Sequence, residues 1–159
     1  MAQQPRVIPA RQGGESPPTH FQITATDTGG AFEWFEMEVS YGDGPIYHSH
    51  QRADAVLRVL KGEVKFKLDG VLADLLEGDT CYIPSGTPYT FTNVYPNRPA
   101  RLLGMYVPAG LQAFLEVWND LTAQGPPDEI TLAELAARYG QVALGPPLAV
   151  ELNLPDIEA

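Results

Sequence analysis

Two stretches of the sequence decide the fold: GDGPIYHSHQRADAVLRVLKG at residues 42–62 and GDTCYIPSGTPYTFTN at residues 78–93. In both, short runs of β-branched and aromatic residues are bounded by Gly, Pro and Asp, which is typical of strands joined by tight turns. Between them, residues 64–68 alternate apolar side chains with lysines, and Asp69-Gly70 follows as a hairpin signal. This part of the chain therefore predicts antiparallel strands with one buried face.

The same pattern of short strands and turns continues on both sides, from residue 21 to residue 108. Gly and Pro contribute 15 residues each to a chain of 159, a share that favours many short segments over a helical bundle. The length suits one domain with a core of its own. We therefore expect residues 21–108 to form an all-β sandwich or barrel.

The two flanks of this region have other patterns. Residues 1–20 are rich in Gln, Pro, Gly and Arg, which is typical of a flexible arm or of a segment laid across a neighbour. Residues 109–123 carry apolar side chains at helical spacing, namely Leu111, Phe114, Leu115, Trp118 and Leu121. A capping-box pattern at residues 131–134 predicts a second short helix that ends at residues 139–140. We expect residues 109–159 to form a helical appendix that packs on the barrel or on a second copy of the chain.

The acidic balance of the chain excludes some classes of partner. With 20 acidic against 10 basic residues the net charge is −10, so the surface repels nucleic acid and anionic lipid. No apolar run resembles a signal peptide or could span a bilayer, and the expected location is the cytoplasm. The single cysteine, Cys81, rules out an internal disulfide framework and a Cys-based zinc site, and we expect it to be buried and inert.

The histidines limit any metal site, because the chain has only His20, His48 and His50. A His-x-His pair on a strand points both imidazoles to one face, since side chains alternate with period two. Two converging imidazoles are half of a site for zinc, iron, nickel or copper. The same pair is equally explained as two histidines that are hydrogen-bonded in a polar lumen.

Residues 42–62 and 78–93 resemble the two motifs of the cupin family. The first motif is a glycine, five residues, His-x-His, three or four residues, a glutamate, six residues and a glycine. The second is a glycine, five residues, Pro-x-Gly, two residues, a histidine, three residues and an asparagine. Every spacing fits, and the family's turn residues stand at Gly62, Gly78, Pro84, Gly86 and Asn93.

The resemblance extends over about residues 30–148 and is strongest to the bacterial branch named quercetin 2,3-dioxygenase-like. It implies a cupin jelly roll, a homodimer, and metal-dependent dioxygenation of a small molecule. In that family the metal is held by both histidines of the first motif, its glutamate, and the histidine of the second motif.

This sequence departs from the family's ligand set at two of four positions. His48 and His50 match, but Ala55 stands where the glutamate belongs and Tyr89 where the third histidine belongs. Asp54 could supply a carboxylate only if a bulge turned it inward, because strand alternation otherwise points it outward. Alternatively, Tyr89 could bind ferric iron as a phenolate. We expect no cofactor, or an atypically held divalent metal.

The residues in place of the ligands predict a pocket of another kind. His48, His50 and Tyr89 would converge in one cavity and act as acid and base on a substrate. Strand alternation predicts that Leu57 and Phe91 line this cavity. Trp34 and Glu36, on the strand before the first motif, line it as well if their face of the strand points inward, and Glu36 has no role if that face points to solvent.

Three functions stay open at this point. The leading one is an enzyme that cyclises, isomerises or dehydrates an aromatic or polyketide-like substrate without a metal. The second is metal-dependent dioxygenation, and the third is a binding module that holds a ligand unchanged. In the last case Tyr89 only fills the space that the metal site left.

Overall fold

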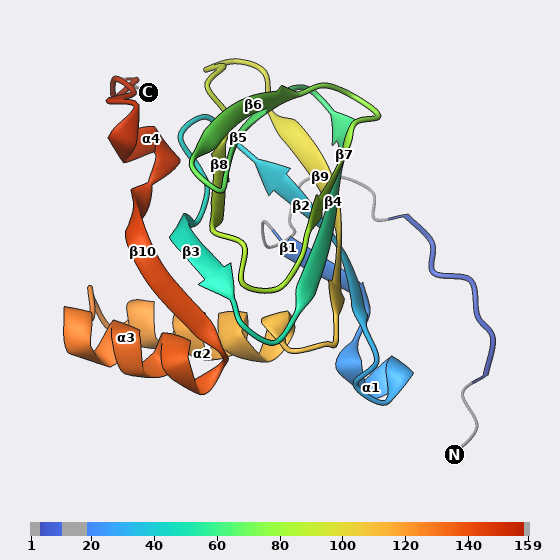
Figure 1. Cartoon of the computed structure of the whole chain (residues 1–159). Coiled ribbons are helices and arrows are strands. Elements are labelled where there is room, and N and C mark those ends of the chain that lie inside the picture. The colour runs from blue at the N-terminus through green and yellow to red at the C-terminus, as the bar shows by residue number, and fades with distance from the viewer. Residues whose placement is uncertain (1–3, 11–18, 158–159) are drawn as a thin grey trace.

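Two five-stranded antiparallel sheets face each other and form the body of the protein (Figure 1). The computed structural model describes residues 4–10 and 19–157. In the first sheet the strands lie in the order β1-β2-β9-β4-β7, and in the second in the order β10-β3-β8-β5-β6. This architecture confirms the predicted β-sandwich of the jelly-roll kind.

The elements are short, as the turn-rich composition predicted. The strands are β1 Thr19–Ile23, β2 Glu33–Val39, β3 Ile46–His50, β4 Asp54–Lys61, β5 Val64–Leu68, β6 Val71–Leu75, β7 Thr80–Ile83, β8 Tyr89–Thr92, β9 Ala100–Val107 and β10 Gln141–Pro147. The helices are α1 Ala25–Thr28, α2 Leu111–Thr122, α3 Glu129–Arg138 and α4 Leu148–Glu151. No helix within the described residues has the length and apolar character needed to cross a membrane.

Apolar side chains of both sheets meet in one core. Residues that alternate along the strands are completely shielded from solvent, among them Val59, Val64, Phe66 and Leu102. The lysines of β5 lie on the other face, where Lys65 forms an ion pair with a carboxylate of β6. The alternation in this strand therefore separates core from surface as its sequence predicts.

Asn93 fixes the end of β8 against the neighbouring turns. Its buried amide nitrogen donates to the carbonyls of Val39 and Arg98, and its oxygen accepts from the backbone N–H of Tyr95. Gly44 lies so close to this strand that a Cβ there would be 1.8 Å from the carbonyl oxygen of Phe91. These contacts hold β8 beside the segment that leads into β3.

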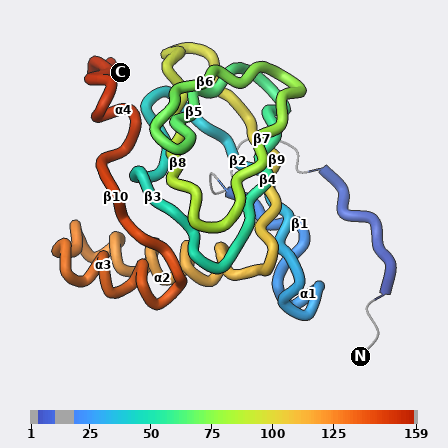
Figure 2. Tube along the Cα trace, in the orientation of Figure 1, coloured from blue at the N-terminus to red at the C-terminus, as the bar shows by residue number. Residues whose placement is uncertain are grey.

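The C-terminal region corrects the predicted division of the chain at residue 108. Strand β10 pairs with β3, so that Gln141 lies opposite His50 and Ala143 opposite His48. Figure 2 shows the two strands side by side, with α2 and α3 preceding β10. The barrel therefore includes residues 141–147, a segment that the sequence analysis assigned to a helical appendix.

The helices themselves lie close to their predicted positions. Helix α2 falls within residues 109–123, but α3 begins two residues before the predicted start. Asp128 is its N-cap, and the Asp128 carboxylate accepts from the backbone N–H of Thr131. The short helix α4 was not predicted.

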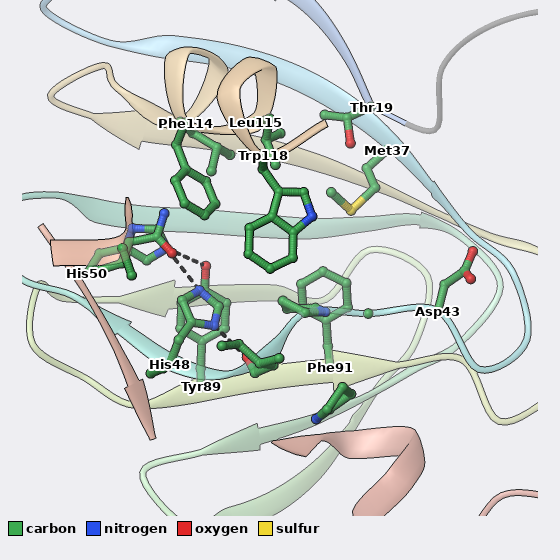
Figure 3. A pocket seen from close by; sticks show the side chains of 18 of the residues that line it. Thr19, Met37, Asp43, His48, His50, Tyr89, Phe91, Phe114, Leu115 and Trp118 are labelled. Atoms are coloured by element: carbon green, nitrogen blue, oxygen red, sulfur yellow. Dashed lines mark hydrogen bonds between the residues drawn. The ribbon is translucent and has the colours of Figure 1, made fainter. Parts of the chain in front are cut away.

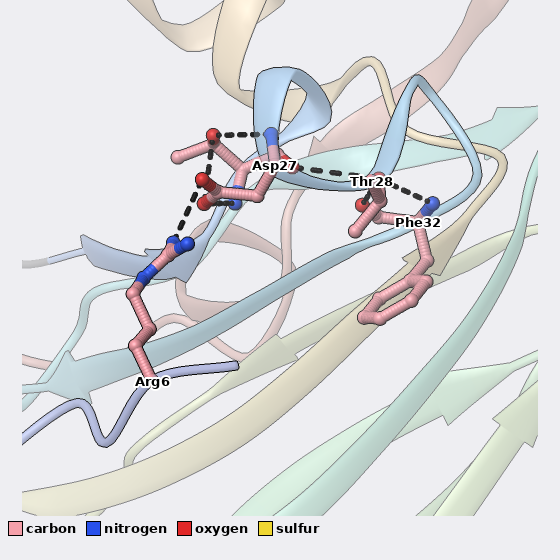
Figure 4. Close-up of polar contacts among 5 residues, drawn as sticks. Arg6, Asp27, Thr28 and Phe32 are labelled. Carbon is pink, nitrogen blue, oxygen red and sulfur yellow. Dashed lines mark hydrogen bonds and ion pairs between the residues drawn. The ribbon is translucent and has the colours of Figure 1, made fainter. Parts of the chain in front are cut away.

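The N-terminal arm was predicted to extend to residue 20, but β1 begins at Thr19 and includes His20. Residues 4–10 have no helix or strand, and Arg6 forms an ion pair of 2.7 Å with Asp27 (Figure 4). Asp27 also forms a capping box with Thr24 at α1. The remainder of the expected arm, residues 1–3 and 11–18, lies outside the described residues.

Candidate functional site

A cavity of about 960 Å³ lies between the barrel and the helical segment α2–α3. Its floor is formed by His48, His50, Tyr89 and Tyr106. Its roof is the apolar stripe of α2, made of Leu111, Phe114, Leu115 and Trp118. Figure 3 shows His48, His50 and Tyr89 together at one end, with Trp118 and Phe91 between them and Asp43. The cavity is thus polar at its floor and apolar along its length.

Strand register brings the four floor residues together. His48 and His50 lie two residues apart on β3 and share a face, and Tyr89 of β8 is the cross-strand partner of His48. Tyr106 comes from β9 in the opposite sheet. All four side chains are buried, with at most 8% of their surface exposed.

The floor residues form one hydrogen-bonded cluster. The Nδ1–H of His48 donates to the carbonyl oxygen of Ile46 at 2.6 Å, and Nε2 of His48 lies 3.0 Å from Nε2 of His50. The hydroxyl oxygens of Tyr89 and Tyr106 lie 3.4 and 3.3 Å from the same His50 nitrogen. The two hydroxyl groups are also hydrogen-bonded to each other.

The positions of the hydrogens follow from the bond to Ile46. Because the carbonyl can only accept, neutral His48 carries its hydrogen on Nδ1, and its Nε2 is an acceptor. His50 therefore donates from Nε2 to His48, since two lone pairs at 3.0 Å would repel each other. One phenol donates to the other, and the second phenolic hydrogen then has no acceptor within the cluster, because the nearby His50 nitrogen already carries a hydrogen. The cluster thus has one spare O–H donor.

Burial keeps all four groups uncharged near neutral pH. Loss of solvent lowers the pKa of His50 to about 3, assisted by the neighbouring His48, and also lowers the pKa of His48. Burial raises the pKa of Tyr106 to about 12 and that of Tyr89 well above its ordinary value. The floor therefore consists of neutral imidazoles and neutral phenols.

Several of the predicted site residues lie around this cavity. The structure brings His48, His50 and Tyr89 together and places Leu57 and Phe91 in the lining. Their catalytic and binding roles stay predictions.

Tyr106 was missed by the sequence analysis. It lies on the inward face of β9, on which Ala100, Leu102 and Tyr106 are all buried and alternate with more exposed residues. That alternation was the signal that could have found it.

Trp34 and Glu36 do not line the cavity, which corrects their predicted role. On β2 the buried part of the cavity is lined by Phe35, Met37 and Val39, and the exposed Glu38 lines its rim, whereas Trp34 and Glu36 are absent from the lining. A Cβ at Gly104 would meet the Phe35 ring, so only a glycine on β9 leaves room for this inward side chain. His20 is the cross-strand partner of Glu36 and is likewise absent from the lining.

Asp54 points away from the floor, so the bulge that would have turned it inward is absent. The register of β4 with β9 is regular from Asp54 to Val59. One Asp54 carboxylate oxygen accepts from the backbone N–H of Ser85 at 2.8 Å, and the other lies 3.5 Å from the Tyr82 hydroxyl. Its carboxylate therefore stabilises the turn between β7 and β8.

Glu33 fixes the start of the roof and was also missed. Its side chain is almost fully buried, and its carboxylate accepts from the backbone N–H groups of Gly110, Leu111 and Gln112. A carboxylate at a helix N-terminus satisfies donors that lack intrahelical partners. This contact joins α2 to β2, and the apolar stripe of α2 faces the cavity.

Cys81 is buried, and burial raises the pKa of its thiol. This is the environment expected of an inert cysteine.

The donor atoms of the floor do not fit a divalent metal held as in the resembling family. The Nε2 atoms of His48 and His50 are close enough to share an ion. However, the described residues contain no group of three His, Cys, Asp or Glu side chains that could hold one. The phenols of Tyr89 and Tyr106 are neutral, and a neutral phenol is a poor metal ligand.

Residues 35–106 match the family model described as the Cupin domain. The fold is a cupin jelly roll. The matched region contains all four floor residues, whereas α2, α3 and β10 lie beyond it.

Three proteins illustrate how far this likeness extends. An uncharacterized protein of Methanocaldococcus jannaschii is 31% identical over 68 residues, which is 43% of this chain and 54% of that protein. A cupin-superfamily sugar phosphate isomerase from Silicibacter pomeroyi has a TM-score of 0.50 at 18% identity, over 58% of this chain and 61% of its own. A predicted oxalate decarboxylase from Thermotoga maritima has a TM-score of 0.52 at 20% identity, over 56% of this chain and 77% of its own.

These likenesses establish the cupin fold and nothing about substrate. This chain spans about half the length of the curated relative that it matches. The two structural neighbours have low sequence identity, so a function has to be argued from the site itself.

Proposed function

We propose that this cupin is a small-molecule enzyme that moves protons on a ring-bearing substrate without a bound metal. Isomerisation, cyclisation and dehydration are the reactions that this chemistry serves. The observation that carries the proposal is the spare phenolic O–H of the floor, which faces a cavity lined by aromatic and aliphatic side chains. An apolar cavity with a few converging polar groups suits a small organic ligand.

The paired phenols would bind a carbonyl oxygen of the substrate. One phenol donates to the other, which polarises the second O–H and strengthens it as a donor. When a proton leaves the carbon beside the carbonyl, negative charge develops on the oxygen. A hydrogen-bond donor fixed in a buried site stabilises that charge far better than it would in water.

The neutral imidazoles supply the proton acceptor. In the hydrogen arrangement described above, His50 Nδ1 is the imidazole nitrogen of the floor that neither carries nor accepts a hydrogen, and it takes the proton from the carbon beside the carbonyl. It returns the proton to another carbon, which isomerises the substrate. If the proton is returned to a leaving hydroxyl group, the products are a dehydrated substrate and water. Neither route needs an oxidant or a reductant. Burial weakens the free imidazole as a base, and the charge developing on the ligand oxygen offsets this effect.

Hydrogen exchange on 2-tetralone, a neutral bicyclic ketone, tests the proposal without the natural substrate. The protein is incubated with this ketone in deuterated buffer, and loss of the signal of the hydrogens beside the carbonyl is followed by NMR. We expect exchange to be faster than in buffer alone. Tyr89→Phe and Tyr106→Phe should each slow it by about 10²-fold and change the affinity for the ketone much less.

Tyr82→Phe is the matched control, because Tyr82 is exposed on β7 and lies outside the cavity. This variant should retain the full exchange rate. If the ketone binds but exchanges no faster than in buffer, the chain is a binding module and the proposal fails. Elemental analysis of the purified protein tests the alternative function. Stoichiometric iron, nickel, copper or manganese would contradict the metal-free proposal and favour metal-dependent dioxygenation.

The resemblance to the quercetin 2,3-dioxygenase-like branch, the homodimer and the cytoplasmic location stay predictions.

A further inference from the structure

We propose that the cavity selects uncharged, ring-bearing ligands and rejects those that carry a phosphate or a carboxylate. The inference deepens the proposed function and rests on the same cavity and donor hydroxyl. It concerns the charge of the ligand, which the chemistry of the floor leaves open.

No positive charge reaches the cavity from the described residues. None of their lysine or arginine side chains belongs to the lining. Lys65 and Lys67 form ion pairs with Asp74 and Glu151 outside it. Arg52 packs on Gly140 on the outside of the barrel. A phosphate or carboxylate entering the cavity would therefore lose its water without gaining a cationic partner, which is costly.

The helix N-termini that could bind an anion are already occupied. The first N–H groups of α2 face the carboxylate of Glu33, at 2.8 Å for Leu111 and 3.0 Å for Gly110. At α3 the carboxylate of Asp128 accepts from the N–H of Thr131 at 2.7 Å. Both ends already hold a negative charge of the protein's own, so a second anion there would be repelled.

The charged side chains that do line the cavity are acidic. They are Glu38, Asp43 and Glu129, and all three are exposed, so they lie where the cavity meets solvent. With a net charge of −10 on the whole chain, these carboxylates repel an approaching anion before it reaches the floor. The buried histidines do not compensate, because they stay neutral in the cluster described above.

The remaining lining suits a flat apolar ring. Phe91 contributes an aromatic face from the barrel, and Phe114 and Trp118 contribute rings from the roof, where they pack together at 5.8 Å between ring centroids. Aromatic side chains gain most from ligands that offer a large apolar face. A ligand with one carbonyl oxygen and an uncharged ring system thus satisfies both ends of the cavity.

Three naphthalene derivatives of matched shape test this selection. They are 2-acetylnaphthalene, which is uncharged, 2-naphthoate, which carries one negative charge, and 2-naphthyl phosphate, which carries up to two. Isothermal titration calorimetry with the full chain measures their affinities. We expect 2-acetylnaphthalene to bind at least about tenfold more tightly than 2-naphthoate, and the phosphate to bind most weakly. Low ionic strength should widen the difference, because the rim carboxylates are exposed.

A gain-of-binding variant makes the test independent of loss of folding. Gln141 lines the cavity from β10 and lies opposite His50, so Gln141→Lys introduces a cation near the floor. This variant should bind 2-naphthoate about tenfold more tightly than the wild type does, whereas the uncharged Gln141→Met should not. Both variants should retain binding of 2-acetylnaphthalene.

Two results would overturn the inference. One is binding of 2-naphthoate or of the phosphate to the wild type as tight as that of 2-acetylnaphthalene. The other is binding of none of the three at about millimolar concentration, which would remove the ring-bearing ligand class. Failure of the proposed function is distinguishable, because it appears as absent hydrogen exchange on 2-tetralone while uncharged ligands still bind.

Discussion

The floor and the roof of the cavity are built in opposite ways. The floor residues are buried in the barrel, and their positions follow from the strand register of both sheets. The roof helix α2 has no buried residue, and the carboxylate of Glu33 holds its first turn. The floor therefore shares the stability of the core, whereas the roof belongs to the parts of a protein that open at low cost. Chemistry should depend on the floor, and ligand capture on the roof.

The largest expected difference between the two regions is in packing energy. Leu102 is fully buried in the core, and Leu115 is a half-buried roof residue. We expect Leu102→Ala to lower the free energy of unfolding by about 2–5 kcal/mol, because it leaves a cavity in the core. Leu115→Ala should cost at most about 1 kcal/mol. Urea denaturation measures both, and equal losses would contradict the separation of core and roof.

The second prediction uses the pH dependence of the floor. Burial lowers the pKa of His50 to about 3 from 6.5, so between these values the unfolded chain binds more protons than the native state. The native state, in which His50 is neutral, has its full stability relative to the unfolded chain above pH 6.5. This stability is lost as the pH falls from 6.5 towards 3, because the unfolded chain binds the proton and the native state does not. We expect the free energy of unfolding to drop by about 1 kcal/mol per pH unit between about pH 6 and pH 4.5.

His50→Gln removes this group, so the variant should show a flatter dependence in the same denaturation series. His20→Gln removes an imidazole outside the cavity and should retain the wild-type dependence. A wild-type stability that is constant between pH 7 and pH 4.5 would refute the assignment of a buried neutral His50.

The third prediction tests whether the carboxylate of Glu33 holds the first turn of α2 against the barrel. Glu33→Ala leaves the N–H groups of Gly110, Leu111 and Gln112 without their acceptor. We expect a loss of about 2 kcal/mol in the free energy of unfolding and faster amide hydrogen exchange in the first turn of α2. Glu36→Ala, on the outer face of the same strand, should change neither quantity by more than about 0.5 kcal/mol. Unchanged protection of α2 in Glu33→Ala would show that other contacts hold the roof.

Floor and roof also differ in how much the sequence could predict. Strand alternation and motif spacing placed His48, His50 and Tyr89 on one surface, because period-two geometry is local. The same reasoning kept Asp54 outward by default. Tyr106 was missed because its strand lies in the opposite sheet, and no local pattern states which strands face each other. Trp34 and Glu36 were misplaced because the inward face of β2 depends on Phe35, whose space is made by Gly104 on another strand.

The roof was harder to predict, because its contacts join distant segments. The sequence showed the apolar stripe of α2 but not its partner, and Glu33 meets α2 across 77 positions of the chain. Strand β10 was likewise assigned to an appendix, since it contains the turn residues Gly145, Pro146 and Pro147 and pairs only with β3. Local periodicity therefore predicted the elements, and pairing in three dimensions decided which of them enclose the cavity.

The last prediction concerns Trp118, whose removal should affect stability least but tests directly whether the roof binds the ligand. Trp118 lines the cavity and stacks only partly on Phe114, so Trp118→Ala should change the free energy of unfolding by less than about 1 kcal/mol. Its affinity for 2-acetylnaphthalene should nevertheless fall by about tenfold, since the ring loses an aromatic contact. Val117→Ala, on the same helix but outside the lining, should leave the affinity unchanged in the same calorimetric titration. If both variants bind as the wild type does, α2 only shields the barrel. If Trp118→Ala instead unfolds the protein as strongly as Leu102→Ala, α2 is part of the core and the contrast between floor and roof is lost.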